Sequence, residues 1–187
     1  MKVILDANIL VSLKTARKAS PIQELRQLWL IKNAFQVAMS DYIHEEVVRT
    51  LYKPYFLSKL DHDARIEYLW RLRKITTRVE VTTTVVEAAA HPKDDPIVAT
   101  AIDAHLKHII TGDKPFQRKA PHIFETYEIS VLTPEAFIDE EKDFRGFSVL
   151  LYAHHSSLSL CGRACQVLLR PRYLLYEVTV RGLRNAE

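Results

Sequence analysis

The feature that most constrains the fold of this chain is the alternation of strand-like and helix-like segments through its first 140 residues. Residues Lys2–Asp6 form a nearly continuous apolar run, as expected of a strand buried on both faces of a parallel sheet. Parallel strands must be joined by crossover connections, which are usually helices. We therefore expect strands at Lys2–Asp6, Phe35–Met39, Val79–Thr84, His108–Thr111 and Glu128–Leu132.

Helix start signals lie between these strands. Pro21 opens an apolar stripe at helical spacing, and Ser40 is a favourable N-cap for a helix at Asp41–Tyr52, which Pro54 ends. Asp95 followed by Pro96 predicts a further helix, with Asp95 as its cap. We also expect a helix at Asp61–Lys74, with Ile66, Leu69, Trp70 and Ile75 facing inward, and a short one at Pro134–Asp139. The predicted class is α/β, with a parallel sheet covered by helices on both faces.

The composition changes near residue 141. Lysine outnumbers arginine up to Glu140, whereas arginine predominates afterwards, and both cysteines, Cys161 and Cys165, fall in this last stretch. We therefore divide the chain into a domain at 1–140 and a C-terminal extension at 141–187. The extension has three interpretations: a small added module, a partner-binding tail, or a translated segment foreign to the ancestral domain.

Charge and composition exclude several classes of function. The basic excess of the chain lies in the extension, so residues 1–140 are neutral and do not indicate a nucleic-acid groove by bulk charge. No run of 18 apolar residues exists, which argues against a membrane span, and the N-terminus is too short and acidic for a signal peptide. We therefore expect a cytoplasmic protein that does not enter a membrane. With only four glycines there is no phosphate-binding loop, and no cysteine precedes residue 141 to act as a nucleophile.

Carboxylates follow the ends of the predicted strands, where open α/β sheets bind ligands. Asp6 ends the first strand, and Asp113 follows the fourth after Thr111 and Gly112. Asp94 and Asp95 precede a helix, and Glu45 and Glu46 lie in the first turns of another. Each acid alone has an ordinary explanation as a turn former, a cap or a partner of the helix dipole. Acids that converge from several connections repel one another, and such sites normally hold divalent cations.

Three short motifs give the sequence a family resemblance. Leu5-Asp6-Ala7-Asn8, Asp94–Ala101 (DDPIVATA) and Ile110–Lys114 (ITGDK) resemble the motifs of PIN domains in order and spacing. The resemblance covers residues 1 to about 140 and is greatest to the toxin components of prokaryotic toxin–antitoxin pairs. It implies a three-layer sandwich with a central parallel five-stranded sheet flanked by helices.

The resemblance also implies a function and a set of site residues. A PIN protein of this kind would be an Mg²⁺- or Mn²⁺-dependent endoribonuclease that cleaves RNA with metal-activated water, forms a homodimer and binds a cognate antitoxin protein. The acidic quartet would be Asp6, Glu46, Asp94 and Asp113, supported by Asn8, Thr111 and Asp95.

Two positions of this quartet have neighbouring alternatives. If Ile43, Val47 and Leu51 face the core, Glu46 lies about 100° from the centre of that stripe and Glu45 about 160°. Glu46 is therefore better placed at the edge of a cleft. At the other position the family pattern selects Asp94 and leaves Asp95 to cap the helix.

Two other classes of function remain open. One is a catalytically silent PIN-like module that binds RNA or protein. The other is a different metal-assisted phosphoryl hydrolase, such as a phosphatase, which usually has a second aspartate where this chain has Asn8. If the chain is a ribonuclease, basic side chains near the predicted site would hold the RNA backbone: Lys14, Arg17, Lys18, Lys114, Arg118 and Lys119.

Overall fold

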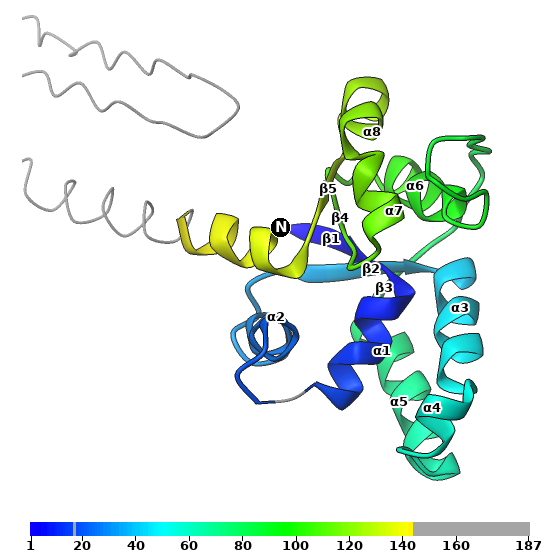
Figure 1. Ribbon diagram of the computed structural model, residues 1–187, viewed down its shortest axis with the longest axis vertical. Helices are drawn as coiled ribbons and strands as arrows, with labels where there is room; N and C mark the ends of the chain where they lie inside the picture. Colours follow the sequence, from blue (N-terminus) through cyan, green and yellow to red (C-terminus); the bar gives the residue numbers. More distant parts are fainter. Residues whose placement is uncertain (17, 144–187) are drawn as a thin grey trace, which may run out of the picture. The chain divides into compact units, whose positions relative to one another are not determined.

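A parallel five-stranded sheet organises the computed structural model, which describes residues 1–16 and 18–143 (Figure 1). The strands are β1 (Lys2–Leu5), β2 (Gln36–Ser40), β3 (Thr77–Val79), β4 (His108–Ile110) and β5 (Ser130–Leu132), and their order across the sheet is β3-β2-β1-β4-β5. All four neighbouring pairs are parallel. The α/β prediction and the five parallel strands are therefore confirmed.

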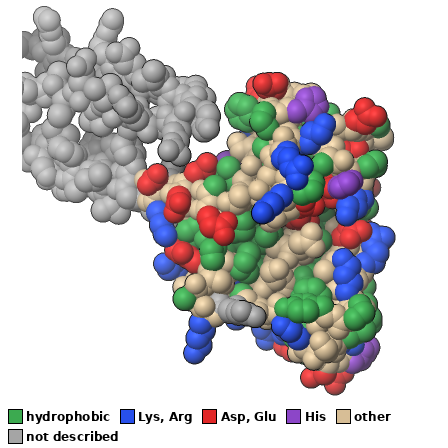
Figure 2. All heavy atoms as spheres, viewed as in Figure 1, with side chains coloured by type: hydrophobic (Ala, Val, Ile, Leu, Met, Phe, Trp, Pro, Cys, Tyr) green, Lys and Arg blue, Asp and Glu red, His purple; other side chains and the backbone are tan. Residues whose placement is uncertain are grey.

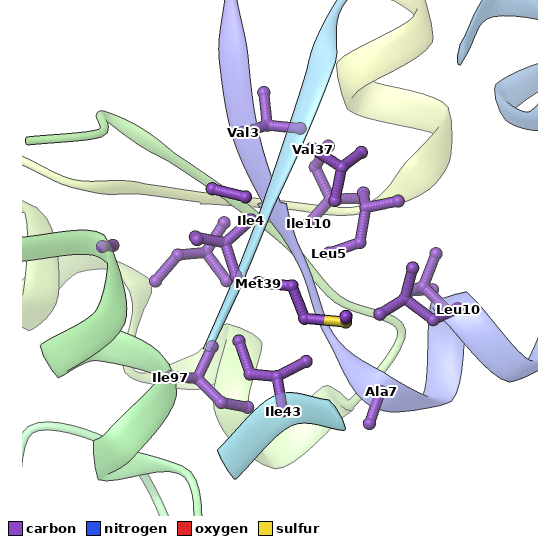
Figure 3. Close-up of a cluster of buried hydrophobic side chains, with 14 of the residues drawn as sticks. Val3, Ile4, Leu5, Ala7, Leu10, Val37, Met39, Ile43, Ile97 and Ile110 are labelled. Carbon is purple, nitrogen blue, oxygen red and sulfur yellow. The ribbon is translucent and has the colours of Figure 1, made fainter. Parts of the chain in front are cut away.

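The central strand β1 is buried because its side chains are apolar on both faces. Val3, Ile4 and Leu5 are fully buried, as a strand covered by helices on both sides requires (Figure 3). Ile4 is in register with Ala38 of β2 on one side and with Ile109 of β4 on the other. The chain thus builds outward from β1 in one direction first and then in the other.

Helices form the two outer layers. In Figure 1, α1 (Ala7–Thr15), α2 (Pro21–Leu30), α3 (Asp41–Leu51), α4 (Pro54–Leu57) and α5 (His62–Ile75) lie below the sheet, and α6 (Asp95–Asp103), α7 (Lys114–Arg118) and α8 (Ala120–Tyr127) lie above it. Residues 134–143 are also helical. The three-layer sandwich is confirmed, and the helical connections move from one face of the sheet to the other between β3 and β4. The carboxyl ends of β1 and β4 therefore meet at the switch point of the fold.

The helix starts follow local chemistry. The Ser20 and Ser40 side chains accept hydrogen bonds from the backbone N–H groups of Gln23 and Ile43, so both serines cap a helix. Asp61 caps α5 in the same way, with its carboxylate 2.7 Å from the N atom of Ala64. These three starts confirm that short polar side chains before an apolar stripe fix where a helix begins.

The third strand lies earlier than predicted. The sequence placed it at Val79–Thr84, but β3 covers Thr77–Val79, and the threonines leave the sheet. The cause is the end of the neighbouring strand: Val79 is opposite Ser40, the last residue of β2, so no strand lies beside the residues that follow. The Asp103 carboxylate of α6 instead accepts hydrogen bonds from the N–H groups of Thr82 and Thr83 and from the Thr83 hydroxyl.

The inward face of α5 also differs from the prediction. Ile66, Trp70 and Ile75 are 47%, 61% and 45% exposed, whereas Leu69 packs against the core as predicted. The buried positions are Arg65 and Leu72, which share a face with Leu69 at helical spacing. The Lys74 ammonium lies over the Trp70 ring at 5.3 Å, so this indole has a cationic neighbour at the surface.

The helix at 134–143 crosses the boundary that we placed after residue 140. Its Phe137 is fully buried and meets the Phe35 ring edge-on at 5.0 Å, and Ile138 and Glu141 are buried as well. Residues 1–143 form one compact unit. The predicted extension lies outside the described residues from 144 onward. In the part of the chain that the structure describes, no helix has the length and apolarity needed to cross a bilayer.

Candidate metal centre

The candidate site lies at the switch point of the sheet, at the carboxyl ends of β1 and β4. Asp6 follows β1 and its N–H donates to the Ile110 carbonyl at the end of β4, at 3.0 Å. Asp113 lies three residues after the end of β4 and is the N-cap of α7, and Asp94 is the N-cap of α6. The space-filling view shows acidic atoms recessed beneath Lys and Arg side chains near the middle of this face (Figure 2).

The Asp6 carboxylate is buried and is oriented by Thr111. Its Oδ2 accepts a hydrogen bond from the Thr111 hydroxyl at 2.7 Å, and both side chains are shielded from solvent. Burial raises the pKa of Asp6, and the negative charge of Asp113 adds to this, whereas Thr111 and the nearby N–H groups of Asn8 and Ala7 oppose it. Asn8 therefore acts on Asp6 through its main chain, and its side chain is exposed.

Thr111 connects Asp6 with Asp113. Its Oγ1 donates to Asp6 and accepts a hydrogen bond from the Asp113 N–H at 3.0 Å. Its carbonyl oxygen accepts from the Gln117 side chain at 2.8 Å, which fixes α7 against the loop. A single hydroxyl thus sets the orientation of one carboxylate and the backbone position of the other.

Asp94 is buried without a counter-charge in direct contact. Its Oδ2 is shielded from solvent and has no hydrogen-bond partner, and it makes no side-chain cap bond to α6. Burial, followed by the charges of Asp6 and Asp113, raises the pKa of Asp94 to about 6, and Lys93 and His91 oppose this rise. A buried carboxylate oxygen with no donor is costly unless a cation or a proton satisfies it.

Asp95 does not cap α6, which corrects the sequence prediction. The N-cap is Asp94, and Asp95 is the first residue of the helix itself. The buried Asp95 carboxylate instead accepts hydrogen bonds from the N–H groups of Glu87 and Ala89, at 2.9 and 2.8 Å. Glu87 has a positive φ of 58°, so these bonds hold a tight bend in the loop that leads to Asp94.

Glu46 lies on the site side of α3, but in a different arrangement from the aspartates. Its carboxylate is 32% exposed and pairs with Arg49 at 2.7 Å, one helical turn later. Glu45 is exposed and acts electrostatically on His44, on another side of the helix. Of the two alternatives, Glu45 and Glu46, the position on α3 therefore favours Glu46.

Tyr42 joins Glu46 to the aspartates, and sequence reasoning missed it. Its hydroxyl donates to the Lys93 carbonyl, immediately before Asp94. Burial and the charges of Glu46, Asp94 and Asp6 raise the pKa of the Tyr42 phenol. The four-residue spacing to Glu46, which places both side chains on one helix face, was the signal that could have found it.

We name Asp6, Asp94 and Asp113 the acid cluster. The charge of Asp113 raises the pKa values of Asp6 and Asp94, and among the described residues none of the three carboxylates makes an ion pair with a basic side chain. No three acidic, histidine or cysteine side chains between residues 1 and 143, Arg17 apart, are placed to hold an ion together as they stand. The donor set nevertheless fits a hard divalent cation, because it offers carboxylate oxygens, one of them buried and unpartnered.

The basic side chains predicted to hold RNA have separate positions. Lys14 lies over the Tyr68 ring at 5.6 Å, so it is engaged on α1. Lys114 and Arg118 belong to α7, directly after Asp113, and are exposed beside the acid cluster. Lys18 and Lys119 are exposed as well, and Arg17 lies outside the described residues.

Comparisons with known proteins found a matching family model and similar solved structures. Residues 2–115 match the family model of the PIN domain. The crystal structure of PAE2754 from Pyrobaculum aerophilum is similar with a TM-score of 0.51 and 16% identity, over 76% of this chain and 90% of that one. The structure of FitAcB from Neisseria gonorrhoeae is similar with a TM-score of 0.37 and 16% identity, over 72% of this chain and 98% of that one. No curated protein matches the sequence.

Proposed function

The chain belongs to the PIN domain family, and from this premise we propose that it is an Mg²⁺- or Mn²⁺-dependent endoribonuclease, the toxin component of a type II toxin–antitoxin pair. PIN domains are in general nucleases, which supports hydrolysis of a phosphodiester bond.

The acid cluster is the observation that carries this proposal. Three carboxylates meet at the switch point of the sheet, and burial and mutual repulsion raise the pKa values of Asp6 and Asp94. A fold that needed these groups only as caps or turn formers would give each of them a donor. Asp94 has none for its buried Oδ2, so its environment favours a cation.

The acid cluster would hold the ion, with Glu46 as a further ligand. When bound, a divalent ion would polarise the scissile phosphate and lower the pKa of a water molecule, so that hydroxide would be available at neutral pH. Thr111 keeps Asp6 in one orientation and positions the Asp113 backbone. Asp95 holds the loop that carries Asp94 through the N–H groups of Glu87 and Ala89.

The partners follow from the family resemblance. We propose a homodimer that is neutralised by a cognate antitoxin protein. The neutral charge of the first 140 residues agrees with a substrate that is held through an ion and a few local cations such as Lys114 and Arg118, because no large basic surface is needed.

A cleavage assay with two substrates tests the proposal. Purified full-length protein should cut single-stranded RNA with Mg²⁺ or Mn²⁺, stop on chelation, and leave a small phosphate ester intact. Asp113→Asn should abolish cutting, while Asp103→Asn, an acid on the far end of α6, should not. RNA binding without metal-dependent cutting would assign a silent binding module, and hydrolysis of the ester would assign a phosphatase; either result overturns the nuclease proposal.

A further inference from the structure

Beside the acid cluster, two adjoining hollows form a groove that none of the site residues above explains. The larger, of about 510 Å³, is bounded by Asp41, Tyr42, Arg78, Val79, Glu80 and Val81. The smaller, of about 260 Å³, is bounded by Asp41, His44, Arg73, Thr76 and Arg78. Because Asp41 and Arg78 line both hollows, we treat them as one feature and name it the rim groove. The larger part has the size of a small-molecule site.

The larger hollow of the rim groove lies on the same edge of the sheet as the acid cluster. Asp41 and Tyr42 follow the carboxyl end of β2, and Glu80 follows that of β3. In the strand order β3-β2-β1-β4-β5, β2 is one strand and β3 two strands from β1, so this part of the edge is roughly 5 to 10 Å across the sheet from Asp6. A ligand that extends from the acid cluster along this edge towards β3 therefore reaches the larger hollow.

Tyr42 is the physical link between the two regions. It lines the larger hollow, and its hydroxyl donates to the Lys93 carbonyl beside Asp94. Glu46 lies one turn further along α3. Burial, the charge of Glu46 and the charge of Asp94 all raise the pKa of the Tyr42 phenol. The tyrosine ring is thus a wall of the groove at the end nearest to the acids.

The larger hollow combines apolar walls with acceptors. Tyr42, Val79 and Val81 are half-buried and supply a flat ring and two branched side chains. Asp41 and Glu80 supply carboxylate oxygens, which repel phosphate and accept hydrogen bonds from amino groups. A nucleobase with an exocyclic amino group matches this lining, because carboxylates accept from cytosine N4 and aromatic rings stack on bases.

The smaller hollow adds positive charge. Arg73 lines this hollow alone and Arg78 is shared with the larger one, and guanidinium groups bind phosphate well. The His44 Nε2 is shielded and has no hydrogen-bond partner. Arg78 pairs with Asp41 at 2.5 Å, but the two side chains are 79% and 58% exposed, so this ion pair is weak and a phosphate can replace it.

From this juxtaposition we propose that the rim groove binds one nucleotide of a single-stranded RNA next to the cleaved bond, with the base in the larger hollow and its phosphate on Arg73 and Arg78. The groove prefers a base with an exocyclic amino group to uracil. This inference rests on the proposed function, since it names a subsite and a base preference for the same RNA.

Binding of short RNAs to the full-length protein in chelator tests this inference without any cleavage. Fluorescence anisotropy should show that labelled decacytidylate binds about tenfold more tightly than decauridylate, since one good base contact has that effect. Asp41→Ala with Glu80→Ala should remove this preference. Tyr42→Leu should weaken binding about tenfold because it removes the ring on which the base stacks.

The arginines are tested by salt dependence. Arg73→Gln with Arg78→Gln should weaken binding of both oligomers and reduce the slope of log K against log salt by roughly 0.7, the value for one phosphate of a single strand. The matched control is Glu67→Gln with Arg71→Gln, an exposed pair on the same helix α5, which should bind RNA like the wild type. Thermal melts confirm that each variant is folded.

The outcomes separate the two proposals. Equal affinity for both oligomers in the wild type, or groove variants that bind like the α5 control, overturns the rim groove proposal even if the protein cuts RNA. In that case the groove is a surface for another class of partner, such as a protein. A wild type that prefers cytidine and loses this preference in the variants supports the groove, even if no metal-dependent cutting is found and the nuclease proposal fails.

Discussion

The stability of the metal-free protein tests the acid cluster most directly, because without an ion the burial of Asp94 and the charges of Asp6 and Asp113 disfavour its ionised form. Asp94→Asn removes one charge at nearly constant shape. The Oδ2 of Asp94 has no hydrogen-bond partner and makes no side-chain cap bond, so the substitution removes no recorded hydrogen bond. The variant should therefore be more stable than the wild type in chelator at pH 7, which is opposite to the usual effect of replacing a buried residue.

The magnitude follows from the pKa of Asp94, which rises from 3.8 to about 6. Each tenfold change in an acid dissociation constant corresponds to about 1.4 kcal/mol, so ionising Asp94 in the fold is unfavourable by about 2 to 3 kcal/mol at pH 7. In the pH window from about 4 to about 6, the native protein retains a proton that the unfolded chain has released. The stability of the wild type therefore falls relative to Asp94→Asn as the pH rises through this window, and the two proteins converge below it.

Urea unfolding at a series of pH values in chelator measures this difference. The control is Asp103→Asn on the same helix α6, because the hydrogen bonds from Thr83 and Thr82 lower the pKa of Asp103. That variant should be less stable than the wild type at neutral pH, and its deficit should fade in acid. Magnesium should then stabilise the wild type by mass action but have little effect on Asp94→Asn. An Asp94→Asn protein no more stable than the wild type at pH 7, with the control as expected, would refute the unfavourable ionisation of Asp94.

Three further predictions use single contacts of the fold. Thr111→Val should reduce RNA cleavage about tenfold or more at saturating Mg²⁺, because Asp6 loses its hydroxyl donor; an unchanged rate would show that Asp6 needs no orientation. Asp95→Asn should destabilise the fold by about 1 to 3 kcal/mol in urea unfolding, since one of two buried N–H groups loses its acceptor; a change below about 0.5 kcal/mol would contradict this. A chain ending at Asp143 should fold cooperatively, whereas one ending at Asp139 should melt lower because it lacks the buried Glu141 turn; equal melting would contradict the continuous helix.

Local patterns predicted the parts of the fold that depend on short stretches of sequence. The apolar run of β1 is buried on both faces, so composition alone identified it. The caps at Ser40 and Asp61 depend on a side chain three residues from its backbone donor, and no distant contact can change that. The placement of the acids also followed from the strands, because the carboxyl ends of parallel strands lie at the same edge of the sheet.

Distant contacts decided what the sequence could not show. Residues Ile66 and Trp70 have helical spacing, but so do Arg65 and Leu72, and the second set is buried. The choice depends on the Leu60 carbonyl, which accepts a hydrogen bond from the Arg65 guanidinium and makes its burial possible. Likewise β3 ends at Val79 because its partner strand β2 ends opposite it at Ser40. A pattern of spacing contains no information about such partners.

The pair of aspartates before α6 shows why neighbouring residues with the same chemistry can have different roles. By sequence, Asp95 before Pro96 is a good cap, but its carboxylate is used by the loop at Glu87 and Ala89. Asp94 is left to start the helix without a side-chain bond. The loop donors are thus used by Asp95, whereas the buried Oδ2 of Asp94 has no hydrogen-bond partner and is available for a cation.

The last prediction concerns Glu46, which now contacts Arg49 and not the aspartates. If Glu46 ligates the ion, it must leave this pair, so the pair competes with metal binding. Arg49 is 55% exposed and Glu46 32%, and an ion pair of this kind is worth at most about 1 kcal/mol. Arg49→Gln should therefore tighten Mg²⁺ binding by up to about fivefold in calorimetry, whereas Glu46→Gln should weaken it. Magnesium affinities that are the same in Glu46→Gln and in the wild type would remove Glu46 from the metal centre and leave the acid cluster as the whole of it.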